Sequence, residues 1–189
     1  MVHPCQTERM ARFVVLLRGV NVGGHNKVPM TTFRSILESL GHTEVATYLQ
    51  SGNAIFTSGK RNAHRLAADI EQSLADRLGI DVPVLVLSQA ELGQIAGNNP
   101  MLYLDDDPTH LHVAFFSAKP DPAAVEDLDP KAFAPDQFAV VGDVAYLHFP
   151  NGMGRSKLDP GRAFAKLGVW STARYWRTVN ALLEIAESR

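Results

Sequence analysis

The chain has 189 residues, of which 46% are hydrophobic and 20% charged, and its formal net charge is -2. A single domain of this length buries roughly 70% of its unfolded surface, so one or two domains can form without structural cross-links. The small net charge provides no overall attraction to nucleic acid or to an anionic membrane, and it disfavours both as partners.

Two features indicate a cytoplasmic location. The only cysteine, Cys5, excludes an internal disulfide, as expected in a reducing compartment. No apolar run approaches the roughly 20 residues that a membrane helix needs, and Phe13–Leu17 is too short for the apolar region of a secretory signal. We expect residues 1–11 to be an N-terminal extension without regular structure.

The first half of the chain predicts the element order β-α-β-β-α-β. The spacing of apolar residues distinguishes helices from strands, and glycines mark where helices end. The turn Ser51-Gly52-Asn53 indicates a hairpin. This order is that of a ferredoxin-like plait. Strands are expected at residues 13–17, 44–49, 54–57 and 82–87, and helices at residues 30–40 and 62–78.

The second half predicts the same order. A short helix opened by the capping residues Ser88–Glu91 and an acidic loop at residues 105–108 precede it. Strands are expected at residues 111–116, 137–141, 144–149 and 171–176, and helices at residues 122–128, 158–167 (interrupted near Pro160) and 178–188. We therefore predict an α+β fold of two tandem ferredoxin-like plaits with antiparallel sheets. The predicted domains are residues 12–104, which include a linker helix, and residues 105–189, which include a C-terminal helix.

The topology of the first half predicts a polar site. The strands at residues 13–17 and 44–49 run in the same direction in such a sheet. The loop Gly19–Pro29 and the hairpin tip Gln50–Asn53 therefore emerge at the same edge. A tight strand-to-helix crossover and an ordinary turn would use the same residue types as a binding site. Because the loop and the hairpin tip emerge at one edge, a binding site is favoured.

The residue types at this edge favour an anion. Glycines allow the backbone to approach a ligand closely, and free N–H groups in such a loop form an anion-binding nest. Two cations supply charge, and amide and hydroxyl side chains supply hydrogen bonds. The candidate ligand-binding residues are Arg18, Gly19, Asn21, Gly23, Gly24, Lys27, Gln50, Ser51 and Asn53.

Standard nucleotide motifs are missing from this loop. Gly19 and Gly24 have the glycine spacing of a Walker A loop, but His25 and Asn26 stand where Lys and Ser or Thr are required. The dinucleotide motif GxGxxG is also missing. The sequence therefore supports neither a nucleoside triphosphatase nor a dinucleotide-dependent dehydrogenase.

A second glycine-rich loop, residues 150–157, precedes a helix in the second half. Its residues Arg155, Ser156 and Lys157 could contact phosphate, although an ordinary connection with solvated charges is the simpler interpretation. Arg174, the next candidate ligand-binding residue, lies in an aromatic and cationic segment. That segment could stack on nucleotide bases, but a strand with its arginines outside is favoured.

His110 and His112 share one face of an expected strand beside the acidic loop. Such a pair with a carboxylate can hold a metal ion. A polar strand face beside an acidic loop is the commoner arrangement, so we predict no metal site.

Several ordered motifs resemble those of the bacterial domain-of-unknown-function family 1697 (DUF1697). They are LLRGVNVGGHNKVPM, YLQSGNAIF, NNP, NGMGRSKL and STARYWRTV, and the resemblance extends over residues 12–186. It implies two ferredoxin-like plaits. It also implies that the candidate ligand-binding residues named above lie at positions that mark the family. The same holds for Gly52, Gly154, Thr172, Trp176 and Thr178. It implies no reaction and no cofactor.

The expected function is binding of an anionic small molecule, phosphate-like or nucleotide-like, at the edge formed by residues 19–29 and 50–53. One alternative is a nucleic-acid-binding module, because plaits often present a sheet to RNA. Another is a protein-interaction or dimerisation scaffold without a ligand. Enzyme status stays open, because anion binding does not distinguish a transferase from a sensor.

Overall fold

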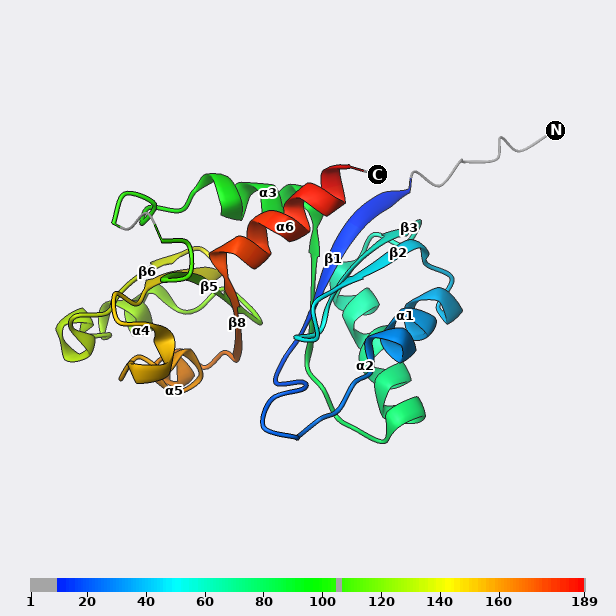
Figure 1. Ribbon diagram of the computed structural model, residues 1–189, viewed down its shortest axis with the longest axis horizontal. Helices are drawn as coiled ribbons and strands as arrows, with labels where there is room; N and C mark the ends of the chain where they lie inside the picture. Colours follow the sequence, from blue (N-terminus) through cyan, green and yellow to red (C-terminus); the bar gives the residue numbers. More distant parts are fainter. Residues whose placement is uncertain (1–9, 105–106, 189) are drawn as a thin grey trace. The chain divides into compact units, whose positions relative to one another are not determined.

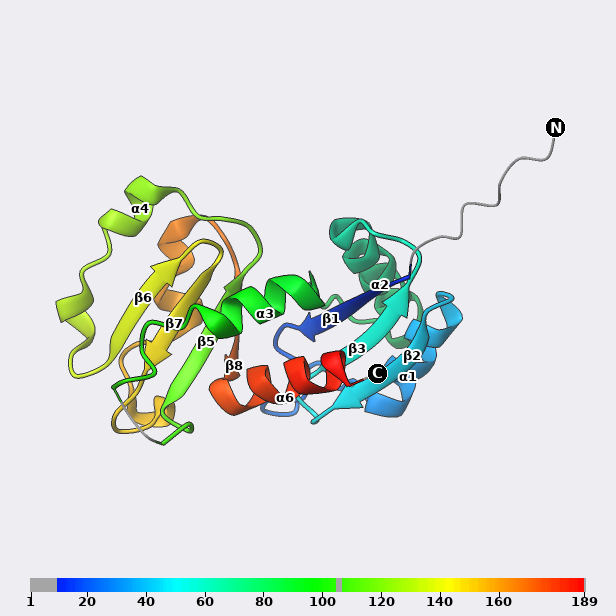
Figure 2. The same cartoon turned by 90° about the horizontal axis from the view of Figure 1, so that it is seen from above.

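The computed structural model of the chain describes residues 10–104 and 107–188, which adopt an α+β fold with two four-stranded antiparallel sheets (Figures 1 and 2). The chain divides into two compact units. One holds the described residues up to Gln89 and those after Glu184, and the other holds Ala90–Glu184. Residues 1–9, with Cys5, and residues 105–106 of the acidic loop lie outside the described residues. The domain boundaries expected after residues 11 and 104 stay a prediction.

The first unit follows the element order that the sequence predicts. Its elements are β1 (Ala11–Leu17), α1 (Met30–Ser39), β2 (Thr43–Tyr48), β3 (Asn53–Ser58), α2 (Ala63–Leu78) and β4 (Val84–Ser88). The strand order in the sheet is β2-β3-β1-β4. β1 is a central strand, since it pairs with β3 on one side and with β4 on the other, and its apolar run Phe13–Leu17 is almost completely buried.

Helix α2 forms where its sequence has helical apolar spacing and a cap at each end. Leu66, Ile70 and Leu74 recur every four residues and are fully buried. The side chain of Asn62 accepts a hydrogen bond from the amide of Arg65 and caps the first turn. Gly79 ends the helix in the left-handed conformation, with φ 66°.

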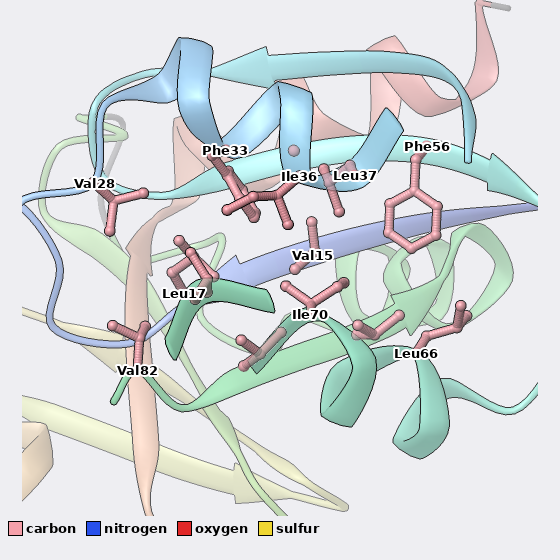
Figure 3. Close-up of a cluster of buried hydrophobic side chains, with 14 of the residues drawn as sticks. Val15, Leu17, Val28, Phe33, Ile36, Leu37, Phe56, Leu66, Ile70 and Val82 are labelled. Carbon is pink, nitrogen blue, oxygen red and sulfur yellow. The ribbon is translucent and has the colours of Figure 1, made fainter. Parts of the chain in front are cut away.

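The core of the first unit lies between its sheet and its two helices, which cover the same face (Figure 1). Figure 3 shows Phe33 and Leu37 of α1 and Ile70 of α2 pointing toward Val15 of β1. Val28 and Val82 lie at the end of this cluster where β1 ends (Figure 3). Buried Val28 therefore anchors the loop that carries most of the predicted site.

The second unit contains a sheet of order β6-β7-β5-β8 (Figure 2). Its strands are β5 (Leu111–Phe116), β6 (Gln137–Val141), β7 (Val144–His148) and β8 (Ser171–Tyr175). Its helices are α3 (Gln89–Gly97), α4 (Pro122–Glu126), α5 (Pro160–Ala163) and α6 (Trp176–Glu187), with α3 beginning and α6 ending just beyond the unit. Three short 3-10 turns are η1 (Pro130–Phe133), η2 (Met153–Arg155) and η3 (Ala165–Leu167). One face of the sheet packs on an aromatic core in which Phe164 makes edge contacts with Phe116 and Phe138.

The helix expected at residues 158–167 is shorter than its apolar spacing suggests. Asp159 caps α5 and Pro160 occupies its first position, where proline is tolerated, so proline starts the helix and does not interrupt it. The break comes at Phe164, after which the chain continues as η3. Within the described residues, no helix has both the length and the apolar character required to cross a membrane.

Candidate functional site

The loop that follows β1 and the hairpin between β2 and β3 are neighbours in the first unit. At the end of β1, the amide of Leu17 donates a hydrogen bond to the carbonyl of Gly52 at 2.8 Å. One residue later, the amide of Arg18 donates to the carbonyl of Pro83 at 3.0 Å. Residues 19–29 and 50–53 therefore lie side by side, as the topology predicts.

The side chain of Asn21 links the loop to the hairpin. Its Nδ2 donates to the carbonyl of Val28 at 3.0 Å and to the carbonyl of Gln50 at 2.6 Å. Its Oδ1 accepts from the amide of Val28 at 2.9 Å. Asn21 has φ 56°, a left-handed conformation that asparagine adopts more readily than most residues. This side chain therefore holds the shape of the edge.

The hairpin tip is built by residues that face the protein. Asn53 is fully buried, and its Nδ2 donates to the carbonyl of Tyr48 and to Oγ of Ser51, both at 2.9 Å. Gly52 has φ 74°, and a Cβ there would lie 2.6 Å from Cγ2 of Val20 and 2.7 Å from Cβ of Leu17. Gly52 thus allows the two segments to approach each other.

Part of the loop backbone is satisfied within the loop. The amide of Asn21 donates to the carbonyl of Asn26 at 3.2 Å, and the amide of His25 donates to the carbonyl of Val22 at 3.1 Å. In the described chain, the amides of Gly23 and Gly24 donate to no protein acceptor. Two backbone donors at the loop tip are therefore available to a ligand.

A shallow concavity of about 390 Å³ lies between the loop and the hairpin. Its lining residues are Asn21, Gly24, Lys27, Val28, Pro29 and Gln50. Lys27 is the charged residue of this set, and the side chains of Lys27 and Gln50 are exposed. Sequence reasoning did not select Val28 and Pro29 as site residues, because neither carries a polar side chain. Their position just before the start of α1 could have identified them as site residues.

The other candidates of the first unit lie around this concavity without lining it. Gly19, Gly23 and Ser51 are exposed, and Arg18 is half-buried. Arg18 and Ser51 also interact with other groups of the protein. Ligand contact by these residues stays a prediction.

In the second unit, Ser156 has a defined structural partner. Its Oγ donates to Oδ2 of the buried Asp136 at 2.6 Å and accepts from the amide of Leu158 at 2.7 Å. Its neighbours Arg155 and Lys157 are exposed. The hydroxyl therefore fixes the loop, and the two cations extend from it.

Arg174 is a buried cation of β8, with 7% of its surface exposed, so the expectation that the arginines of this strand lie outside was wrong for Arg174. Its Nη1 donates to Oγ1 of Thr172 at 2.8 Å and to the carbonyl of Ala173 at 2.9 Å. Desolvation by burial lowers the pKa of the guanidinium to about 10. Arg174 therefore keeps its positive charge at neutral pH. Whether Arg155, Ser156, Lys157 or Arg174 contacts a ligand stays a prediction.

Comparison with known proteins gives a family but no activity. The family model described as "Protein of unknown function (DUF1697)" matches residues 10–146. A solved structure of a conserved bacterial protein from Streptococcus pneumoniae is similar, with a TM-score of 0.73 and 24% identity over 95% of this chain and 100% of that chain. Likeness at this identity shows the fold alone. No curated protein matches the sequence.

Proposed function

The chain belongs to the DUF1697 family of proteins of unknown function, and we propose that it binds an anionic small molecule, phosphate-like or nucleotide-like, at the edge formed by residues 19–29 and 50–53. One observation carries this proposal. Lys27, the exposed amide of Gln50 and Gly24 line the concavity between the two segments, and none of its described lining residues is acidic. The amide of Asn21 also lines it but already donates to two backbone carbonyls. Such a surface attracts negative charge and offers hydrogen-bond donors to it.

The backbone of the loop supports an anionic ligand. Gly19, Asn21 and Gly23 have positive φ, whereas Val20 and Val22 between them do not. Gly24 also has positive φ, so Gly23 and Gly24 form a tight turn between the bridged residues Val22 and His25 at the tip of the loop. The amides of Gly23 and Gly24 then donate to the ligand.

The start of α1 also favours an anionic ligand in the concavity. Pro29 lines the concavity and precedes the first residue of α1, and the first turn of this helix contains no acidic residue. The N-terminal end of a helix carries a partial positive charge and leaves backbone donors without helical partners. An anion held by Lys27 would therefore also benefit from the helix.

The proposed roles follow from the contacts. Lys27 supplies charge, and the exposed amide of Gln50 orients the ligand. Asn21 and Asn53 shape the edge through their hydrogen bonds to the backbone. The proposal for this edge extends to Arg18, Gly19 and Ser51 of the first unit. Ligand contact by Arg155, Ser156, Lys157 and Arg174 of the second unit is a separate proposal.

We also propose that each unit is a ferredoxin-like plait and that the protein acts in the cytoplasm. Two observations support the plait. Each unit has the chain order β-α-β-β-α-β, and neighbouring strands are antiparallel in the sheet orders β2-β3-β1-β4 and β6-β7-β5-β8. A single cysteine in 189 residues supports a reducing compartment.

The test is a ligand titration with matched charge variants. Inorganic phosphate, AMP and ATP are added at millimolar concentration while the thermal midpoint is recorded. We expect at least one of them to raise the midpoint of the wild type and Lys27→Gln to weaken that ligand about tenfold or more, because a hydrogen bond to a charged group is lost. Lys119→Gln removes an exposed lysine of the second unit and should bind like the wild type.

Two results would contradict the proposal. One is a wild type that none of the three compounds stabilises. The other is a Lys27→Gln variant that responds as strongly as the wild type, since the ligand would then bind away from this concavity.

A further inference from the structure

Two aliphatic side chains are exposed beside the concavity at Lys27. Val22 of the loop is 68% exposed, and Leu49 of the hairpin is 52% exposed. Each is the chain neighbour of a residue that lines the concavity, Val22 of Asn21 and Leu49 of Gln50, so its Cα lies about 3.8 Å from that of a lining residue. The hydrogen bond from Nδ2 of Asn21 to the carbonyl of Gln50 at 2.6 Å joins the two segments. Apolar surface therefore flanks the polar concavity on two sides.

The fold does not account for a leucine at position 49. Leu49 has φ 57°, a left-handed conformation that is unfavourable for a bulky side chain and much easier for glycine or asparagine. Its side chain does not belong to the core cluster between the sheet and the helices of the first unit. Leu49 therefore combines backbone strain with apolar surface in water. Strain of this kind is typical of functional segments.

Val22 is held in place at the tip of the loop. It forms a bridge with His25, and the amide of His25 donates to the carbonyl of Val22 at 3.1 Å. The side chain of Val22 also lies outside the core cluster of the first unit. A ligand loses less conformational entropy on binding when the groups that it contacts are already positioned. The loop thus presents a fixed apolar contact next to the free amides of Gly23 and Gly24.

We propose that the anion bound at this edge is a phosphate monoester with an apolar or aromatic organic group, and that Val22 and Leu49 contact that group. This inference rests on the function proposed above. Lys27 holds the phosphate in the concavity, and the ester oxygen carries the organic group toward the apolar flanks. Binding is favoured in proportion to the apolar area that is removed from water. Inorganic phosphate has no such area, so it should bind more weakly.

The test is isothermal titration calorimetry of the full chain with phenyl phosphate, ribose 5-phosphate and inorganic phosphate. At pH 8 all three carry a largely dianionic phosphate, and phenyl phosphate is the one with an apolar group. We expect it to bind the wild type about fivefold or more tightly than the other two compounds. Its binding should also have the most negative heat-capacity change, which is the signature of apolar burial.

Two variants locate the organic group. Leu49→Asn removes the apolar side chain and suits the left-handed backbone, so the variant should be at least as stable as the wild type. It should reduce the preference for phenyl phosphate over inorganic phosphate about threefold or more. Val22→Thr keeps the β-branched shape and replaces a methyl group by a hydroxyl, and it should reduce the preference about twofold. Leu102→Asn removes an exposed leucine of the second unit and should keep the wild-type preference.

Two results would overturn this inference alone. They are equal affinities of the wild type for phenyl phosphate and inorganic phosphate, and an undiminished preference in Leu49→Asn, since the organic group would then lie elsewhere. Failure of the proposed function has a different signature. None of the three compounds would then bind, or Lys27→Gln would bind all of them as tightly as the wild type, and this inference would fail with it.

Discussion

Gly52 is the residue on which the close approach of the hairpin to the loop depends. It has φ 74°, and an added Cβ would lie within 2.7 Å of side-chain atoms of Val20 and Leu17, both buried. We expect Gly52→Ala to lower the free energy of unfolding by about 2 to 4 kcal/mol, from left-handed strain and overpacking together. Urea unfolding followed by circular dichroism measures the change.

Gly79 provides the control, because it belongs to the same unit, has φ 66° and has open space around its missing Cβ. Gly79→Ala should cost only about 1 kcal/mol, the contribution of backbone strain alone. Equal losses in the two variants would mean that the contacts of Gly52 with Val20 and Leu17 contribute nothing.

At the residue scale, the sequence predicted that the loop and the hairpin tip are neighbours, but not which groups their side chains contact. Asn21 and Asn53 were selected for their hydrogen-bonding groups, and both bond the backbone of the edge itself. Ser156 was selected in the same way, and it bonds Asp136. Residue type gives donor and acceptor capacity. Side-chain direction depends on φ and on partners distant in sequence, which no local pattern contains.

At the scale of elements, Asn21 connects the loop after β1 to the hairpin of β2 and β3. Asn21→Gly removes its three hydrogen bonds and relieves the left-handed backbone at φ 56°. We still expect the variant to lose about 1 to 3 kcal/mol of unfolding free energy, because the amide of Val28 and the carbonyl groups of Val28 and Gln50 lose their partner.

The companion variant is Asn21→Ala, which loses the same bonds and adds backbone strain, so it should be less stable than Asn21→Gly. Urea unfolding orders the two variants and the wild type. A glycine variant as stable as the wild type would show that these hydrogen bonds do not hold the two elements together.

Elements with strong periodicity and clear ends were predictable from the sequence. α2 is the example, since Leu66, Ile70 and Leu74 mark its face, and Asn62 and Gly79 mark its ends. The segment at residues 158–167 was less predictable. Its apolar spacing is helical, yet it forms the short helix α5 and the 3-10 turn η3, because Phe164 leaves the helical conformation to pack in the aromatic core.

At the scale of the whole molecule, the repeated β-α-β-β-α-β order was predictable, whereas the long-range contacts of α3 were not. The domain boundary that the acidic loop at residues 105–108 suggests by its composition stays a prediction, and almost all of α3 belongs to the second compact unit. The hydroxyl of Tyr146 in β7 donates to the carbonyl of Ile95 in α3 at 2.8 Å, a contact between residues 51 positions apart. Composition cannot report such a contact.

Buried histidines make the stability of the whole molecule sensitive to acid. Desolvation by burial lowers the pKa of His112 from 6.5 to about 4, and it also lowers the pKa of His42. A histidine whose folded pKa is depressed contributes stability that is complete above pH 6.5 and is lost as the pH falls toward 4. For His112 the loss approaches about 3 kcal/mol.

His112→Phe isolates this contribution, because an aromatic ring can take the place of imidazole between Phe149 and Tyr175, whose ring centroids lie 5.1 Å and 4.2 Å from that of His112. The unfolding free energy is measured by urea titration at several values between pH 4 and pH 7. We expect the variant to lose less stability than the wild type over this interval, since phenylalanine takes up no proton. Parallel pH profiles would mean that His112 is protonated as readily in the folded chain as in the unfolded chain. The aromatic pocket of the second sheet would then not exclude the charge.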